Sequence, residues 1–178
     1  MLQAYYRLFL FAAVFVVGCK PSSEKTYADA HAPVATVTFE HRFPIQFGGK
    51  EIHVQLALTE LEKARGLMGR TSLQENEGMF FVFPSNQERS FWMRDVPINI
   101  SLGYLTEDGK LDEIKALYAN DPSSVPSRSR EIRYVLEMPE GWFEKAGIKP
   151  GAQIDIEAVR AGITARGFKP GSFLPEKR

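Results

Sequence analysis

Short segments in which apolar and polar residues alternate recur along this chain, and turn sequences separate them. In residues 51–58, for example, apolar side chains occupy every second position at the start, which is the two-residue period of a half-buried strand. The turns include Gly48-Gly49-Lys50 and Glu107-Asp108-Gly109-Lys110, both typical of β-hairpins. Because no strand–helix–strand rhythm appears, the pattern predicts a mainly β fold: a single antiparallel β-sandwich or barrel-like domain.

Two segments carry helix signals, so we expect two short helices. Thr59-Glu60-Leu61-Glu62 is a capping box, which predicts a helix that ends near Gly66. Residues 139–147 begin with Pro and end with Gly, which predicts the second helix. The first strand is expected at residues 34–39 and the last at residues 153–159. The β domain would therefore span residues 34–160, and a loose C-terminal tail, rich in Gly and Pro, would span residues 161–178.

The N-terminal segment has the pattern of a bacterial lipoprotein precursor. Residues 8–17, LFLFAAVFVV, are apolar but shorter than the roughly 20 residues that span a bilayer. They lead into Val16-Val17-Gly18-Cys19, which resembles a lipobox, where the peptidase cuts before the cysteine and the cysteine is acylated. The alternative is an ordinary signal segment with a cysteine there by chance. Because Cys19 is the only cysteine, we predict a signal peptide over residues 1–18 and lipidation at Cys19.

The predicted anchor determines the predicted location. Residues 19–33 contain Ser, Pro, Ala and charges without an apolar period, so we expect a flexible tether. The domain would face the periplasm or the exterior of the cell envelope. Lys20, rather than Asp, follows the cysteine, which favours the outer membrane in a host with two membranes. The 22 basic residues balance 22 acidic ones, so the charge gives no indication of nucleic-acid binding.

Aromatic residues and arginines are concentrated in residues 65–105, around the apolar run Gly78–Phe83 and Trp92. A guanidinium over an aromatic ring, or a guanidinium fork aimed at a carboxylate or phosphate, suits an anionic or sugar-like ligand. The alternative is that the rings form core and the arginine stems cover its edge, and we assign the phenylalanines to core. Asn99 could bond the nearby backbone or point into a pocket. The candidate binding residues are Arg65, Met68, Arg70, Trp92, Met93, Arg94 and Asn99.

The sequence offers little for catalysis. The three histidines, His31, His41 and His53, lack metal-site spacing, so we predict no metal site and no cofactor. An enzyme that cleaves envelope polymers would need two acids about 5–9.5 Å apart across a cleft. Acids in or beside expected strands are Asp95, Asp112, Glu113, Glu131, Glu137, Asp155 and Glu157. For the pair Asp155 and Glu157, we favour a solvated outer face.

Several motifs resemble domain of unknown function family 192. They are RGLM at residues 65–68, SFWM at 90–93, PINI at 97–100 and YVLE at 134–137. The resemblance covers about residues 52–157 and implies a small, mainly β domain of bacteria and archaea, often secreted or lipid-anchored, with no established activity. Two positions differ from the family pattern: Asn99 replaces an Asp, and Ala152 replaces the Asp of a Gly-Asp pair. An acid that served a function there would be absent from this chain.

Together these features predict a lipid-anchored envelope protein that binds a small molecule, a glycan or an envelope protein without catalysis. The alternative is a carboxylate-dependent enzyme acting on envelope polymers. A purely structural role would instead predict a surface without a pocket.

Overall fold

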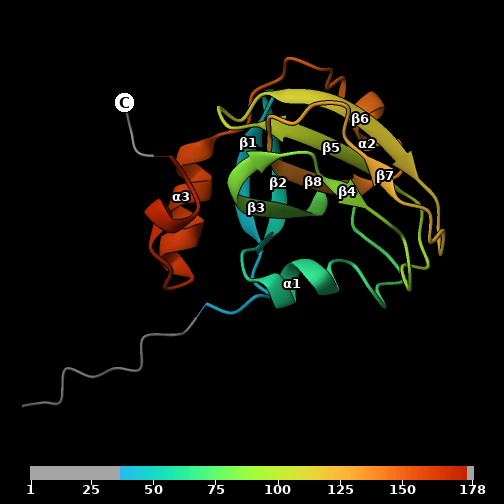
Figure 1. Cartoon of the computed structure of the whole chain (residues 1–178), viewed down its shortest axis with the longest axis horizontal. Helices are drawn as coiled ribbons and strands as arrows, with labels where there is room; N and C mark the ends of the chain where they lie inside the picture. The colour runs from blue at the N-terminus through green and yellow to red at the C-terminus, as the bar shows by residue number, and fades with distance from the viewer. Residues whose placement is uncertain (1–36, 176–178) are drawn as a thin grey trace, which may run out of the picture. The chain divides into compact units, whose positions relative to one another are not determined.

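The computed structural model describes residues 37–175. The predicted signal peptide, Cys19 and the tether lie outside this range. The main sheet has six strands, in the order β1, β2, β3, β8, β5, β6 (Figure 1). These strands are β1 (Phe43–Phe47), β2 (Lys50–Ala57), β3 (Glu77–Gln87), β8 (Ile132–Pro139), β5 (Ile100–Thr106) and β6 (Leu111–Leu117). A small second sheet pairs β4 (Ser90–Phe91) with β7 (Val125–Pro126).

The mainly β prediction is confirmed, but the sheet is mixed rather than antiparallel. Both predicted hairpins are present, as β1–β2 and β5–β6. The exception is β2 with β3, which pair in parallel. Residues 58–76 connect these two strands and contain a helix, and such a crossover is long enough to bring the chain back in the same direction. In the described range β1 and β6 end the sheet without pairing to each other, so it does not close into a barrel.

The capping-box prediction is confirmed at α1 (Glu60–Arg65). The Thr59 hydroxyl accepts a hydrogen bond from the Glu62 N–H, and the Glu62 carboxylate accepts one from the Thr59 N–H at 3.0 Å. The second predicted helix is present as α2 (Trp142–Ala146), which begins three residues after Pro139. Pro139 itself belongs to the end of β8.

Neither strand predicted at the ends of the domain is present in the described residues. Residues 37–39 are not in a strand, whereas residues 34–36 lie outside the described range. Of the expected last strand, Gln153 and Ile154 form only isolated β-bridges. Residues 156–159 instead begin α3 (Ile156–Ala165), because the Asp155 carboxylate accepts hydrogen bonds from the N–H groups of Glu157 and Ala158 and caps the helix. The described residues thus contain three α-helices rather than two.

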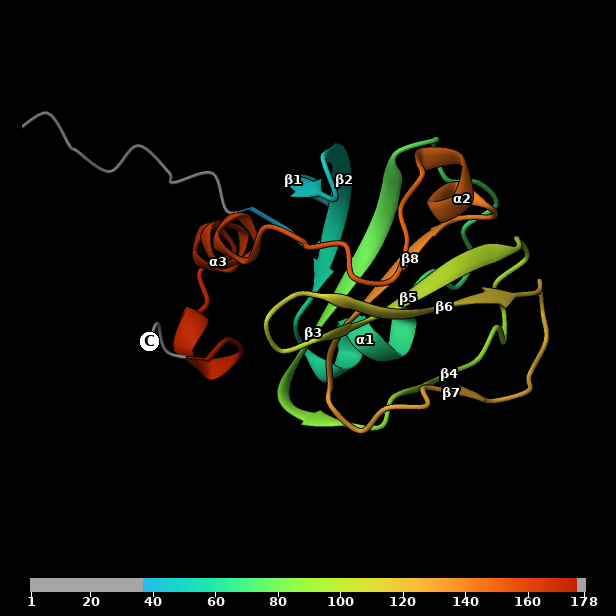
Figure 2. The ribbon, with the colours of Figure 1, turned by 90° about the horizontal axis from the view of Figure 1, so that it is seen from above.

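The segment that we expected to be a loose tail is packed as far as residue 175. It contains the second half of α3 and the 3₁₀ helix η1 (Pro170–Ser172), and Leu174 is buried. Figure 2 shows α3 beside β1 and β2, and Val159 and Ile163 join Phe43 and Leu56 in the core there. Val159 and Ile163 are four residues apart, so they lie on the same face of α3. This apolar face packs α3 against the core.

Each face of the main sheet carries its own hydrophobic cluster. The first contains Phe80 and Leu136 and is covered by α2 and α3; the second contains Met79, Phe81 and Val135. The run Met79–Val82 is therefore buried on both faces, as its continuous apolar character predicts. Leu67 and Met93 cover part of the second face, which is the one that carries the candidate site. Within residues 37–175, the helices are too short and too polar to be candidate membrane spans.

Candidate functional site

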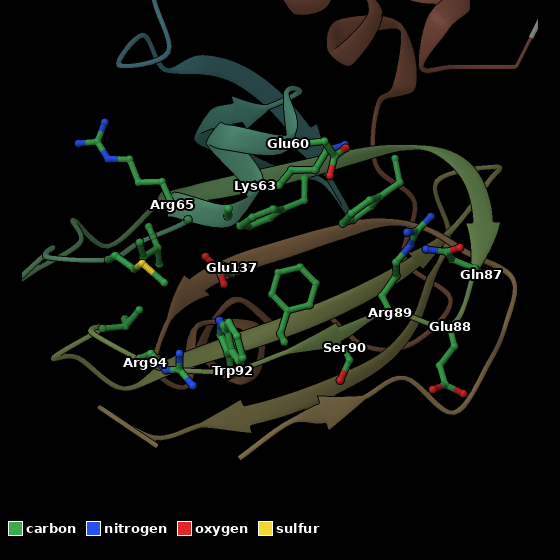
Figure 3. A pocket seen from close by; sticks show the side chains of 18 residues that line it. Glu60, Lys63, Arg65, Gln87, Glu88, Arg89, Ser90, Trp92, Arg94 and Glu137 are labelled. Carbon is green, nitrogen blue, oxygen red and sulfur yellow. The ribbon is translucent and has the colours of Figure 1, made fainter. Parts of the chain in front are cut away.

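A cavity of about 320 Å³ lies over the second face of the sheet. One wall comes from α1 and the residues after it, including Lys63, Arg65 and Met68. The opposite wall comes from residues 87–96, which leave β3 and pass through β4. Figure 3 shows Glu137 of β8 between these walls, with Trp92 and Arg94 on the side opposite α1. The cavity thus lies where segments 60–68, 87–96 and β8 meet.

Glu137 forms the floor of the cavity. It pairs with Met79 of β3 on one side and with Leu102 of β5 on the other, and directly opposed residues share a face of the sheet. The residue is only 5% exposed. Its Oε2 atom has no hydrogen-bond partner among the described residues. Burial raises the pKa of Glu137 to about 8, so the carboxyl is mostly protonated at pH 7.

The walls are aromatic. The ring of Phe91 meets the ring of Phe81 edge-on at 4.9 Å between centroids, and Phe83 also lines the cavity. Trp92 is 48% exposed and the Arg94 guanidinium lies 4.5 Å from its ring centre. Such a half-exposed indole can contact a ligand without first leaving the core.

Basic groups outnumber acidic ones around the cavity. The lining contains Lys63, Arg65, Arg89 and Arg94 and, besides Glu137, the acids Glu60 and Glu88. The Lys63 ammonium bonds Glu60 at 2.9 Å and lies 4.8 Å from the centre of the Phe83 ring. Arg65 and Arg94 are exposed, and Arg65 pairs with the exposed Glu40 at 3.3 Å. With Glu137 protonated, the lining carries an excess of positive charge.

Arg89 is the buried member of this basic set. It donates to the carbonyl oxygens of Ser85 and Ile132, and its guanidinium lies 3.8 Å from the centre of the Phe83 ring. Burial, and then the positive charge of Arg133, lower the pKa of Arg89 to about 10. Arg89 therefore remains cationic at pH 7 and packs against the ring of Phe83, which lines the cavity.

Four of the seven predicted binding residues line this cavity: Arg65, Met68, Trp92 and Arg94. The other three lie elsewhere. Arg70 bonds Glu40 at 3.1 Å and also bonds the side chain of Gln55, and Met93 is 1% exposed within the second cluster. Asn99 accepts a hydrogen bond from the Ala119 N–H at 2.9 Å and donates to Glu140, so it holds a loop rather than lining the cavity.

Sequence reasoning missed the floor of the cavity. The sequence presents Glu137 only as one of several acids in or beside expected strands. The signal that identifies it is its neighbourhood in the chain, because Val135, Leu136 and Met138 around it are all apolar. An acid inside such a segment is enclosed once the sheet is covered on both faces. Phe81, Phe83 and Phe91, assigned to core, also contribute to the cavity walls.

The described residues contain no group of three or more His, Cys, Asp or Glu residues arranged to hold a metal ion. The cavity itself has one enclosed acid, Glu137, whereas Glu60 is exposed and already paired with Lys63. The chemistry that its side chains offer is hydrogen bonding at the floor, stacking at the walls and charge pairing at the mouth.

Fold and site together define a small β domain with a mixed sheet and an aromatic-walled cavity on one sheet face. The chain belongs to domain of unknown function family 192 (DUF192, "Uncharacterized ACR"), whose family model matches residues 43–156. No curated protein matches the chain.

The solved structures that share the fold include the following two. A protein of unknown function from Novosphingobium aromaticivorans is 28% identical, with a TM-score of 0.62 over 78% of this chain and 99% of that one. A candidate transcription regulator from Sinorhizobium meliloti is 23% identical, with a TM-score of 0.60 over 67% of this chain and 95% of that one. The second likeness concerns the fold alone.

Proposed function

We propose that this protein is a lipid-anchored component of the cell envelope whose β domain binds a small organic molecule, without catalysis. The observation that carries the binding proposal is the cavity, which combines a buried unpartnered carboxyl with aromatic walls and a basic mouth. The envelope location is supported by the sequence of residues 1–33, with its apolar run and its lipobox-like cysteine.

The mouth of the cavity favours a ligand with an anionic group. Arg94 is exposed there over the ring of Trp92, whereas Arg65, also exposed, already pairs with Glu40. A guanidinium forms its strongest hydrogen bonds with carboxylates and phosphates. The walls favour an apolar body, because aromatic rings offer contact area at low entropic cost. A small carboxylate, a phosphate ester or an acidic sugar satisfies both requirements.

Binding is tested by thermal shift on the full chain with a panel of envelope glycans, nucleotides and anionic metabolites. The decisive variant is Trp92→Ala, because Trp92 is half-exposed and its truncation leaves the core intact. Tyr118→Ala is the matched control, since Tyr118 is also an exposed aromatic residue (60%) and lies outside the cavity lining. We expect a stabilising ligand to act on the wild type and on Tyr118→Ala but not on Trp92→Ala. Equal stabilisation of all three chains, or of none, would contradict binding in this cavity.

The anchor is tested separately. Cys19→Ala should prevent lipidation, so that the protein leaves the membrane fraction and its N-terminal peptide lacks the mass of the acyl chains. An unchanged membrane fraction, or an unmodified Cys19 in the wild type, would contradict the predicted lipoprotein.

Glu137 also keeps a second function open, that of an acid-dependent enzyme acting on envelope polymers. A carboxyl whose pKa is raised by burial within a cleft is a feature of catalytic acids. This candidate predicts that isolated envelope polymers release soluble fragments with the wild type and not with Glu137→Gln. Absence of release by the wild type would remove it and leave the binding proposal intact.

A further inference from the structure

The two ends of the cavity differ in their chemistry. The mouth carries the exposed guanidinium group of Arg94, which lies over the Trp92 ring. The guanidinium group of Arg65 points away from Glu137 and pairs with Glu40, whereas the floor carries the enclosed carboxyl of Glu137 (Figure 3). We infer that the cavity binds a small zwitterion, whose ammonium group pairs with Glu137 and whose anionic group pairs with the basic mouth. This inference rests on the proposed function, because it needs a ligand in this cavity.

The floor argues for an ammonium group. The Oε2 atom of Glu137 is buried without a donor, and an unsatisfied buried polar group costs about 1–3 kcal/mol. An ammonium group supplies both the missing N–H donors and the charge that favours the carboxylate form. The rings of Phe81, Phe91 and Trp92 also line the cavity, and cations are attracted to aromatic faces.

The mouth argues against a ligand that carries only a positive charge. Four basic side chains line the cavity, against two acids other than Glu137. Two like charges 4 Å apart repel by about 1 kcal/mol in water and about 4 kcal/mol near a protein surface. An anionic group at the other end of the ligand converts this repulsion into attraction, so a molecule with both charges fits the whole lining.

The size of the cavity limits the ligand further. A volume of about 320 Å³ lies at the lower end of the range of roughly 300–1,000 Å³ for small-molecule sites. The apolar walls lie between the two charged ends. The ligand class is therefore an amino acid, or a similar short chain in which an apolar body separates an amine from an acid.

This arrangement couples binding to the release of a proton. In the free protein Glu137 is mostly protonated at pH 7, and pairing with an ammonium group shifts it to the carboxylate. The proton passes from the carboxyl to solvent, and no covalent bond in the ligand changes. The titratable and charged groups that face the cavity or couple to Glu137 are Glu60, Lys63 and Arg65 around α1, Glu88 and Arg89 between β3 and β4, Arg94, and Tyr104 of β5.

The test uses titration calorimetry of the full chain with four probes of matched length: 4-aminobutyrate, butyrate, 4-hydroxybutyrate and butylammonium. The same set with six carbons covers a longer separation between floor and mouth. The variants are Glu137→Gln, which keeps the shape of the side chain without its charge, and the control Glu144→Gln, an exposed acid outside the cavity. Binding enthalpies in two buffers with different ionisation enthalpies give the number of protons released.

We expect the amino acid to bind at least about tenfold more tightly than the other three probes of its length. It should release most of one proton per ligand at pH 7, because burial raises the pKa of Glu137 and keeps the carboxyl mostly protonated before binding. Glu137→Gln should remove both the preference and the proton release, whereas Glu144→Gln should keep both.

The other outcomes overturn the inference in distinguishable ways. If the hydroxy acid or the plain acid binds as tightly and releases no proton, Glu137 acts as a neutral donor and the zwitterion is wrong, although the proposed function stands. If butylammonium binds best, the anionic end is wrong. If no probe binds, but a ligand of the envelope panel stabilises the wild type and not Trp92→Ala, the zwitterion inference is wrong and the proposed function stands. If no ligand of that panel stabilises the wild type either, both the inference and the proposed function are wrong.

Discussion

Arg166, at the end of α3, donates a hydrogen bond to the carboxylate of Glu62 in α1, 104 positions earlier in the chain. Arg166 also donates to the Leu56 carbonyl oxygen at 2.8 Å. The same carboxylate accepts from the N–H groups of Leu58 and Thr59 at the start of α1. One acid therefore links the helix cap to the C-terminal segment, and α1 in turn supplies a wall of the cavity.

Arg166→Ala should destabilise the protein by about 2–4 kcal/mol. The pair is largely buried, with side chains 6% and 14% exposed, and removal of one partner leaves the other charge poorly compensated. Urea denaturation measures the change. Arg65→Ala is the control, because its pair with Glu40 is exposed on both sides (60% and 57%) and should contribute less than about 1 kcal/mol. Equal losses in the two variants would contradict this role of Arg166.

The interaction between Glu62 and Arg166 should also affect how the free energy of unfolding changes at acidic pH. Burial by itself raises the pKa of Glu62, but hydrogen bonds from Thr59, Leu58 and Arg166 outweigh it and bring the folded-state pKa below 4.5. An acid with a lowered pKa stabilises the fold above its unfolded-state pKa, and this contribution disappears as the pH falls through the folded-state value. The free energy of unfolding of Glu62→Gln, measured between pH 6 and pH 3, should therefore fall less steeply than that of the wild type. Parallel curves would exclude this contribution.

Glu137 should have the opposite effect. Burial raises its pKa to about 8, so the folded state keeps a proton that the unfolded state has lost above about pH 4.5. Stability from this group falls as the pH rises from about 4.5 to about 8 and then levels off. Glu137→Gln should therefore equal the wild type near pH 4 and exceed it by a few kcal/mol at pH 8, because a tenfold change in an acid dissociation constant corresponds to about 1.4 kcal/mol.

Denaturation curves at these two pH values measure the effect, with Glu144→Gln as the exposed control. A Glu137→Gln variant that is less stable than the wild type at pH 8 would show that the carboxyl has a stabilising partner in the folded state.

Gly78→Ala should destabilise the sheet directly beside the cavity floor. A methyl group at Gly78 would meet the carbonyl oxygen of Glu137 and lie 2.5 Å from Met138 Sδ. Backbone cannot yield as a flexible side chain does, so we expect a loss of about 3 kcal/mol or more in urea denaturation. Gly171→Ala, which has no atom within 4 Å of the added carbon, should lie within about 0.5 kcal/mol of the wild type. If Gly78→Ala were as stable as the wild type, the backbones of β3 and β8 would have to move apart at this position without a measurable loss of stability.

The sequence predicted part of the candidate site, since four of the seven predicted binding residues line the cavity. The concentration of arginines and aromatic residues in residues 65–105 identified the cavity, because Arg65, Trp92 and Arg94 all line it. Met93 alternates with its neighbours and turns into the core instead. The burial of Glu137 could not be predicted from the alternating pattern of β8. A two-residue periodicity does not show whether the second face of a strand is covered by other residues.

The sequence by itself determined the local structure: the alternating strands, the two hairpins and the capping box of α1. These depend on residues within a few positions of one another, so their signals are complete within a short window. The tertiary structure decided the parallel pairing of β2 with β3, the packing of α3 through Arg166, and the burial of Glu137 between Met79 and Leu102. Each of these joins segments far apart in the chain, and the free energy that selects them comes from surfaces buried only when the whole domain folds.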